Sequence, residues 1–146
     1  FASIFSFLCI SFMSAQVLSW QGGTIPEQTQ PGTLLFNRTG TPLATTNAIY
    51  AHMGVTLNGQ QWQNVIGTWG NNTQQPQLTL VSGNTFSLQL TPSIQEFFSV
   101  NAGAITRINV VFRNAAGTVQ TEDLEINVGG FQVTLNSPIE NSNTIL

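Results

Sequence analysis

Short runs of alternating apolar and polar residues begin at about residue 49 and continue toward the C-terminus. In residues 49–55 one face carries Ile49, Ala51, Met53 and Val55, and the other carries Tyr50, His52 and Gly54. The same alternation recurs in 85–90, 107–113 and 124–128, and it predicts a further strand over 131–135. A period of two indicates strands with one buried face. Leu78 and Leu80 mark another short apolar run.

One segment departs from the period of two. Residues 92–98 start with Pro-Ser and then place apolar residues three and four positions apart. This spacing predicts a single helical turn. Because the segment lies between two predicted strands, we expect it to form a crossover.

Gly, Asn and Pro separate the strands at about 8–12 residues, which is typical of a sandwich or barrel. The predicted fold is all-β: an antiparallel β-sandwich of about 7–9 short strands. We assign residues 33–135 to this module. Residues 16–32, rich in Gly, Pro and Gln, are expected to be an irregular lead-in, and 136–146 a linker toward another domain.

The first 15 residues resemble a secretory signal peptide. They form an apolar, uncharged run that ends at Ala15, too short for the roughly 20 residues of a membrane-spanning helix. Met13 stands where a small residue is preferred, and no basic segment precedes the run. Cys9, the only cysteine, lies inside it, so the mature chain is expected to hold no disulfide. The expected location is secreted or at the cell surface.

Charge is scarce in this sequence. Only 6% of the residues are Asp, Glu, Lys or Arg; there is no lysine, and the net charge is −3. With Arg38, Arg107 and Arg113 as the only cations, no basic patch is expected to neutralise nucleic-acid phosphates. We expect no nucleic-acid partner, no membrane in the mature form and no cofactor.

Few residues have the chemistry for catalysis. His52 is the only histidine, the nearest carboxylates in sequence are Glu27 and Glu96, and no Gly-x-Ser-x-Gly motif is present. Glu122, Asp123 and Glu125 form the only acidic cluster. A paired-carboxylate glycosidase mechanism is one interpretation of that cluster, and cross-strand pairing with Arg107 and Arg113 is the simpler one. The sequence therefore predicts no catalytic residue in this segment, and it predicts no metal site.

Aromatic residues are more informative. Tyr50, His52, Trp62 and Trp69 lie within twenty residues, among Asn and Gln side chains such as Asn58, Gln61, Gln63 and Asn72. A sugar presents a C–H face that stacks on aromatic rings and hydroxyls that bind amide or guanidinium groups. The alternative is that Trp62 and Trp69 are core residues, since tryptophan is usually well buried. Trp20 is expected to pack on a sheet edge.

Three segments carry a resemblance to a known family. They are Ile49-Tyr-Ala-His-Met-Gly-Val55, Trp62-Gln-Asn-Val-Ile-Gly-Thr-Trp-Gly70 and Ile108-Asn-Val-Val-Phe-Arg-Asn-Ala-Ala-Gly117. These segments resemble the N-terminal sandwich module of secreted Bacteroidetes alpha-amylase-type glycoside hydrolases. The Phe-Arg-Asn segment is also similar to starch-binding modules.

The resemblance implies a fold like that of immunoglobulin or carbohydrate-binding modules. It also implies a non-catalytic accessory module that binds a starch-like polysaccharide or positions an enzyme on it, with the catalytic carboxylates in a downstream domain of the same protein. The positions it implies for carbohydrate binding are Tyr50, His52, Trp62, Trp69, Arg113 and Asn114. The alternative function is a purely structural immunoglobulin-like spacer of a cell-surface protein.

Overall fold

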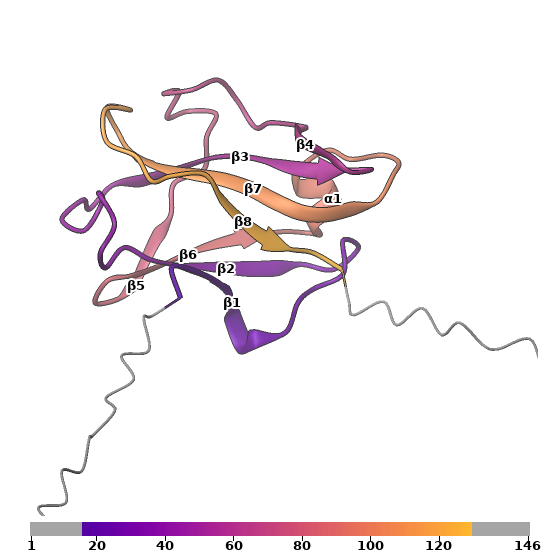
Figure 1. Ribbon diagram of the computed structural model, residues 1–146, viewed down its shortest axis with the longest axis horizontal. Coiled ribbons are helices and arrows are strands. Elements are labelled where there is room, and N and C mark those ends of the chain that lie inside the picture. The colour runs from indigo at the N-terminus through magenta and orange to yellow at the C-terminus, as the bar shows by residue number, and fades with distance from the viewer. Residues whose placement is uncertain (1–15, 130–146) are drawn as a thin grey trace, which may run out of the picture.

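Two antiparallel four-stranded sheets form the protein, and the computed structural model describes residues 16–129 of it. The first sheet has the order β1-β2-β6-β5 and contains β1 (Leu18–Trp20), β2 (Gly32–Asn37), β6 (Thr85–Leu90) and β5 (Thr79–Ser82). The second has the order β4-β3-β7-β8 and contains β4 (Gln60–Gln63), β3 (Ile49–Leu57), β7 (Ile105–Asn114) and β8 (Leu124–Asn127). Figure 1 shows β3 and β7 in one layer and β2 and β6 in the other. The predicted all-β sandwich is confirmed.

The core lies between the two sheets, where the apolar face of each strand is buried. The alternating residues of β3 and β7 that the sequence assigned to one face are completely buried: Ile49, Ala51, Met53, Val55, Ile108, Val110 and Phe112. From the first sheet, Leu34, Phe36, Phe86 and Leu90 meet them. The Phe36 and Phe112 rings bring the sheets together, with centroids 4.2 Å apart. Burying these side chains is the main source of stability of the sandwich.

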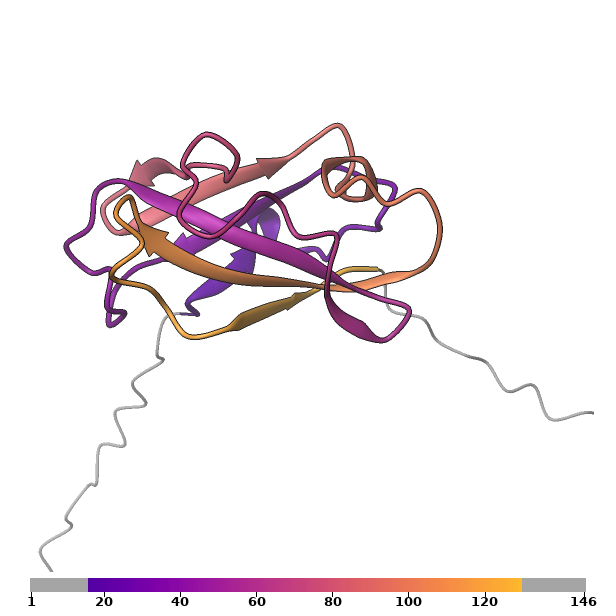
Figure 2. The ribbon, with the colours of Figure 1, turned by 90° about the horizontal axis from the view of Figure 1, so that it is seen from above.

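Strands β3 and β7 form the long central pair of the second sheet, and Figure 2 shows them side by side from above. Their register places Tyr50 opposite Arg113 and His52 opposite Val111. Because side chains alternate across a sheet, these four residues point to the outer face, away from the core. This register is what assembles the candidate site.

The predicted helical turn is confirmed as α1 (Ile94–Phe97), which connects β6 to β7. Ser93 caps it: its Oγ accepts a hydrogen bond from the Glu96 backbone N–H at 3.3 Å and donates one to Glu96 Oε2 at 2.6 Å. Ile94 is fully buried beneath the sheets. A short polar cap followed by an apolar residue therefore explains why a helix forms here.

The N-terminal end of the sandwich differs from the expected lead-in over residues 16–32. Within that segment β1 pairs antiparallel with β2, and a 3₁₀ turn, η1 (Gln21–Gly23), follows. Trp20 is buried at this edge, as expected, and its Nε1–H donates to the Asn127 carbonyl of β8 at 2.8 Å. This bond ties the edge strands of the two sheets together. The described sandwich therefore starts at Leu18, not Thr33.

Several predictions concern residues outside the described range of 16–129. They are the signal peptide over 1–15 with Cys9, the strand over 131–135 and the linker over 136–146. Within residues 16–129 no helix has the length and hydropathy needed to cross a membrane.

Candidate functional site

Four aromatic side chains meet on the outer face of the β4-β3-β7-β8 sheet. The imidazole of His52 stacks on the indole of Trp62, with centroids 5.6 Å apart and an angle of 27°. On its other side it meets the Trp69 ring edge-on, at 5.2 Å and 74°. Tyr50 lies two residues earlier on the same face of β3. We call Tyr50, His52, Trp62 and Trp69 the aromatic patch.

Loop 64–78, which joins β4 to β5, carries Trp69 over this face. Both ends of the loop are bonded to β3: Ile66 N–H donates to the Met53 carbonyl, and Leu78 N–H donates to the Ile49 carbonyl, each at 2.9 Å. Between these anchors, Asn72 and Gln75 of the loop accept hydrogen bonds from Arg113 of β7. Trp69 is therefore held between two backbone attachments to β3 and two side-chain bonds to β7.

A bulge in β4 directs Trp62 toward His52. The pairing of β3 with β4 shifts register between Val55 and Leu57, and Trp62 has a left-handed backbone with φ of 55°. A bulge of this kind changes the direction of a side chain. The backbone N–H of Trp62 donates to the buried Asn109 Oδ1 at 3.3 Å, and the same oxygen accepts from Thr56 Oγ1 at 3.0 Å.

Glycine at position 54 permits the close approach of this segment. A Cβ at Gly54 would lie 2.8 Å from the Gln63 carbonyl oxygen. Any other residue would therefore push β4 and the start of loop 64–78 away from the outer face of β3.

Arg113 lies beneath the patch and is fully buried. Its guanidinium carbon is 5.1 Å from the Tyr50 ring centroid and 5.9 Å from that of Trp69. Nε donates to Gln75 Oε1 at 2.7 Å, and Nη1 donates to Asn72 Oδ1 at 2.8 Å. The expected pairing of Arg113 with the acidic cluster is therefore wrong: its hydrogen-bond partners are amides and carbonyls, and aromatic rings cover its charge.

Asn114 is occupied by the turn that follows β7. Its Oδ1 accepts from the backbone N–H groups of Thr118 and Val119 at 2.9 and 3.1 Å, and its Nδ2 donates to Thr118 Oγ1 at 3.0 Å. Of the six predicted carbohydrate contacts, the structure thus brings together Tyr50, His52, Trp62, Trp69 and Arg113. Arg113 supports the aromatic patch from below, whereas Asn114 lies opposite Ile49 in the register and its side chain faces away from the patch.

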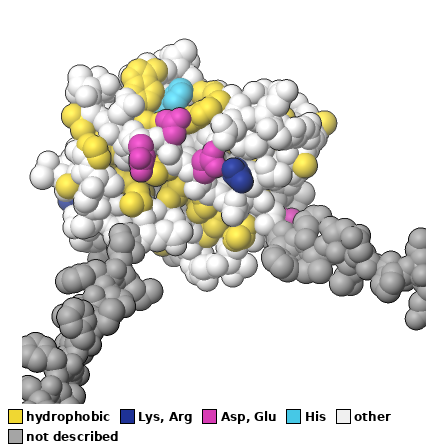
Figure 3. All heavy atoms as spheres, viewed as in Figure 1, with side chains coloured by type: hydrophobic (Ala, Val, Ile, Leu, Met, Phe, Trp, Pro, Cys, Tyr) yellow, Lys and Arg dark blue, Asp and Glu magenta, His cyan; other side chains and the backbone are white. Residues whose placement is uncertain are grey.

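The two tryptophans are not core residues. Trp69 is 43% exposed, and Trp62 is half-buried. Figure 3 shows the histidine at the surface beside hydrophobic side chains, with acidic groups nearby. The patch therefore offers ring surface to solvent, and the buried Trp20 does not contribute to it.

The charges near His52 favour its neutral form. Burial lowers the pKa of His52, the positive charge of Arg113 lowers it further, and Asp123 has a smaller opposing effect. Burial also lowers the pKa of Arg113, with Tyr50 raising it, but a guanidinium keeps its charge at any physiological pH.

A pH dependence of stability follows from His52. The unfolded chain takes up its proton near the ordinary pKa of about 6.5, whereas the folded chain does so at a lower pH. Between these pH values the unfolded state binds more protons than the folded state. The contribution of neutral His52 to the free energy of unfolding is therefore fully present above about pH 6.5, and it is lost as the pH falls. We expect urea unfolding at about pH 7.5 and about pH 5.5 to show this loss, and H52Q to show a weaker one. Equal pH slopes in both proteins would contradict it.

Within the acidic cluster, Glu125 forms a cross-strand pair with an arginine, which was the simpler interpretation of the cluster. Glu125 Oε2 accepts from Arg107 Nη1 at 2.9 Å in an exposed ion pair across β7 and β8, as the cross-strand prediction required for Arg107. Glu122 and Asp123 are exposed. Among residues 16–129 no three His, Cys, Asp or Glu side chains gather as metal ligands.

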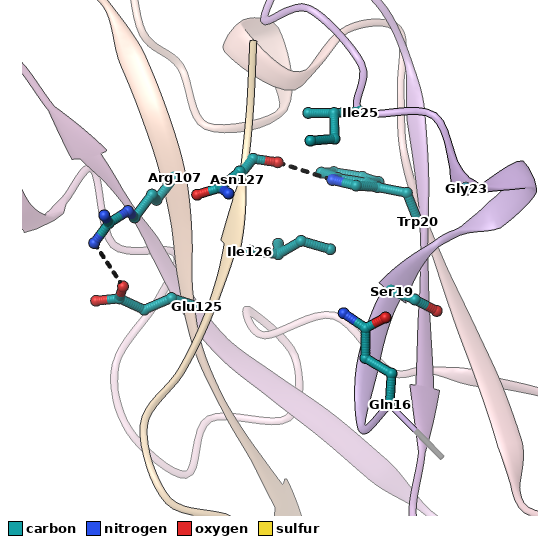
Figure 4. A pocket seen from close by; sticks show the side chains of 9 residues that line it. All are labelled: Gln16, Ser19, Trp20, Gly23, Ile25, Arg107, Glu125, Ile126 and Asn127. Atoms are coloured by element: carbon teal, nitrogen blue, oxygen red, sulfur yellow. Dashed lines mark hydrogen bonds and ion pairs between the residues drawn. The ribbon is translucent and has the colours of Figure 1, made fainter. Parts of the chain in front are cut away.

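A pocket of about 540 Å³ lies elsewhere, between the edge strands β1 and β8. Figure 4 shows Trp20 and Ile126 on its walls and the Arg107–Glu125 pair at its side. None of the six predicted carbohydrate contacts lines it. Its only aromatic wall is Trp20, whose ring is 6% exposed and whose Nε1–H is already bonded to Asn127, so this pocket lacks a stacking surface.

Two comparisons with known proteins were made once the geometry of the patch was established. No protein-family model matches the chain, and no similar sequence was found among the curated proteins. The resemblance to amylase-associated modules therefore stays a prediction.

Sequence reasoning missed Gln75, which connects the two halves of the site. Gln75 is 2% exposed, and its amide lies between Arg113 and His52. It belongs to a polar segment, Asn71-Asn-Thr-Gln-Gln-Pro76, in which nothing distinguishes one amide from its neighbours. Asn109, on the outer face of β7, bonds to Thr56 and Trp62 across strands, and such bonds leave no sequence signal.

Proposed function

We propose that this protein is a non-catalytic sugar-binding module and that the aromatic patch is its binding surface. The observation that carries the proposal is the Trp69 indole, 43% exposed on the outer face of a sheet and held there by His52 and Arg113. An exposed aromatic ring on a rigid support suits the C–H face of a sugar and needs little ordering when the ligand binds.

The groups beside the rings suit hydroxyls: an exposed amide lies next to Trp69, and the exposed carboxylate of Asp123, which acts on His52, can accept from a sugar hydroxyl. Gln74 is exposed and its Oε1 accepts from the backbone N–H of Thr68, the residue before Trp69, at 3.2 Å, so its amide keeps hydrogen-bonding capacity at Nε2. Arg113, the cation nearest the patch, is covered by protein. The surface is therefore matched to neutral hydroxyls, and we propose a starch-like α-glucan as ligand.

The affinity is expected to be weak. One exposed indole beside a half-buried one forms a shallow surface, for which a Kd near 1 mM, about −4 kcal/mol, is a reasonable scale. The role proposed for such a module is to hold a catalytic domain of the same secreted protein on its polysaccharide. The alternative, a purely structural spacer, requires no exposed tryptophan, so the accessible Trp69 ring favours sugar binding.

Removing Trp69 tests the proposal. W69A is expected to weaken binding of maltooligosaccharide by at least about tenfold, because the stacking surface is lost. Isothermal titration calorimetry at millimolar ligand measures the effect. V81A is the matched control, since Val81 is an exposed apolar residue (58%) on β5 of the other sheet, and it should bind as the parent does.

Parallel titrations with cello- and xylooligosaccharides separate the ligand class from the site. Binding of these sugars alone, lost in W69A, would keep the patch and reject the α-glucan. No binding of any of them by the parent protein would reject the function.

A further inference from the structure

A three-residue hydrogen-bond relay fixes the proton of His52. Arg113 Nε lies 2.7 Å from Gln75 Oε1, and Gln75 Nε2 lies 2.6 Å from His52 Nδ1. Arg113 is fully buried, and Gln75 is 2% exposed. The relay joins β7, loop 64–78 and β3, three segments that are separate in the sequence.

The direction of each hydrogen bond follows from donor and acceptor chemistry. A guanidinium N–H can only donate, so the group of Gln75 that faces Arg113 must be its carbonyl oxygen. The amide NH₂ of Gln75 then faces His52, and because it too can only donate, Nδ1 of His52 must accept. A neutral imidazole with an accepting Nδ1 carries its proton on Nε2. The charges around the ring agree, since Arg113 disfavours a second proton more than Asp123 favours it.

The other ring nitrogen of His52 has no partner among the described residues. The only hydrogen bond of this side chain is the one at Nδ1, and Nε2 is not one of the buried polar atoms without a partner. Nε2 is therefore not fully enclosed by the protein, and Figure 3 shows the imidazole at the surface. The imidazole that carries Nε2 lies between Trp62 and Trp69, so the aromatic surface has a single N–H donor near its centre.

We propose that His52 is the hydrogen-bond donor of the aromatic patch: the relay from Arg113 through Gln75 fixes its Nε2–H, and this group binds an oxygen acceptor of the sugar that stacks on Trp69. The proposal rests on the function proposed above and adds the ligand requirement. The sugar must place an oxygen acceptor above His52, and a protonated amino group at that position is rejected because it has no lone pair to accept the N–H.

The tautomer is tested without any sugar. His52 is the only histidine in the sequence, so a long-range ¹H–¹⁵N spectrum of the imidazole contains one set of signals. At about pH 7.5 we expect Nε2 to carry the proton and Nδ1 to be unprotonated. In Q75M, which removes the donor to Nδ1, this preference should weaken. A protein with the proton on Nδ1 would overturn the relay.

Two variants of His52 test the donor role. In H52Q the side-chain amide reaches about as far as Nε2 and restores a donor there, whereas in H52N the amide reaches only the position of Nδ1. Both variants lose the ring, so their difference isolates the donor. We expect H52N to bind maltooligosaccharide about 5–10-fold more weakly than H52Q, the scale of one hydrogen bond.

The outcomes separate the two proposals. Equal binding by H52N and H52Q, in a parent protein that binds the sugar, would overturn the donor role and leave the sugar-binding function intact. A parent protein that binds no sugar would overturn both the function and the ligand role of His52, while the imidazole spectrum would still decide the relay.

Discussion

Replacing Phe112 with alanine is expected to lower the free energy of unfolding by about 3–5 kcal/mol. Phe112 of β7 is fully buried, and its ring lies 4.2 Å from that of Phe36 in the opposite sheet. The substitution removes apolar contacts and leaves a cavity between two sheets that can close only partly. Since domains of this size are stable by about 5–15 kcal/mol, the loss is a large share of the total.

Urea unfolding followed by circular dichroism measures the effect. L80A is the control, because Leu80 is 55% exposed on β5 and its truncation should change stability by less than about 0.5 kcal/mol. If F112A and L80A were equally stable, the packing of the two sheets described here would be incorrect.

Replacing Arg113 with alanine is expected to cost about 3 kcal/mol of stability, because it leaves buried acceptors without a donor and removes a large, fully packed side chain. Gln75 Oε1 and the Asn114 carbonyl, 2.7 and 2.9 Å from the guanidinium, both lose their donor. Trp69 and Tyr50 lose the group that packs against their rings. Loop 64–78 should become mobile, and sugar binding should decline with it.

Arg107 provides the matched control for this experiment. It lies on the same strand and the same face, but its ion pair with Glu125 is exposed, with 49% and 36% of the two side chains accessible. Exposed pairs contribute about 0–1 kcal/mol, so R107A should unfold almost as the parent does. Similar losses in R113A and R107A would show that burial does not distinguish the two arginines.

The period-two alternation predicted the central strands correctly because it reports a physical requirement, one face in the core and one face out. β3, β6, β7 and β8 all follow it, and Pro92-Ser93 predicted α1 through its capping chemistry. β4 was not predicted, since Gln60-Gln-Trp-Gln63 has no alternation. β1 was not predicted either, because its three residues are too few to establish a period.

The candidate site also has one part that the sequence predicts and another that depends on the tertiary structure. That Tyr50 and His52 share a face of one strand follows from sequence spacing alone. That Trp62 and Trp69 meet His52 depends on a bulge, on Gly54 and on the two attachments of loop 64–78 to β3. Two arginines on one face of one strand were indistinguishable in the sequence, and the covering loop made one of them buried and the other exposed.

The sequence by itself therefore determined the class of fold, the buried faces of the long strands and the neutral, aromatic-rich character of the 50–72 region. These are local properties, carried by period, composition and short-range capping. Only the tertiary structure decided which tryptophans reach solvent, that Arg113 supports the aromatic patch from below, and that Gln75 connects it to His52. Those relations depend on contacts such as Gln75–His52 and Tyr50–Arg113, between residues 23 to 63 positions apart, whose geometry no local pattern encodes.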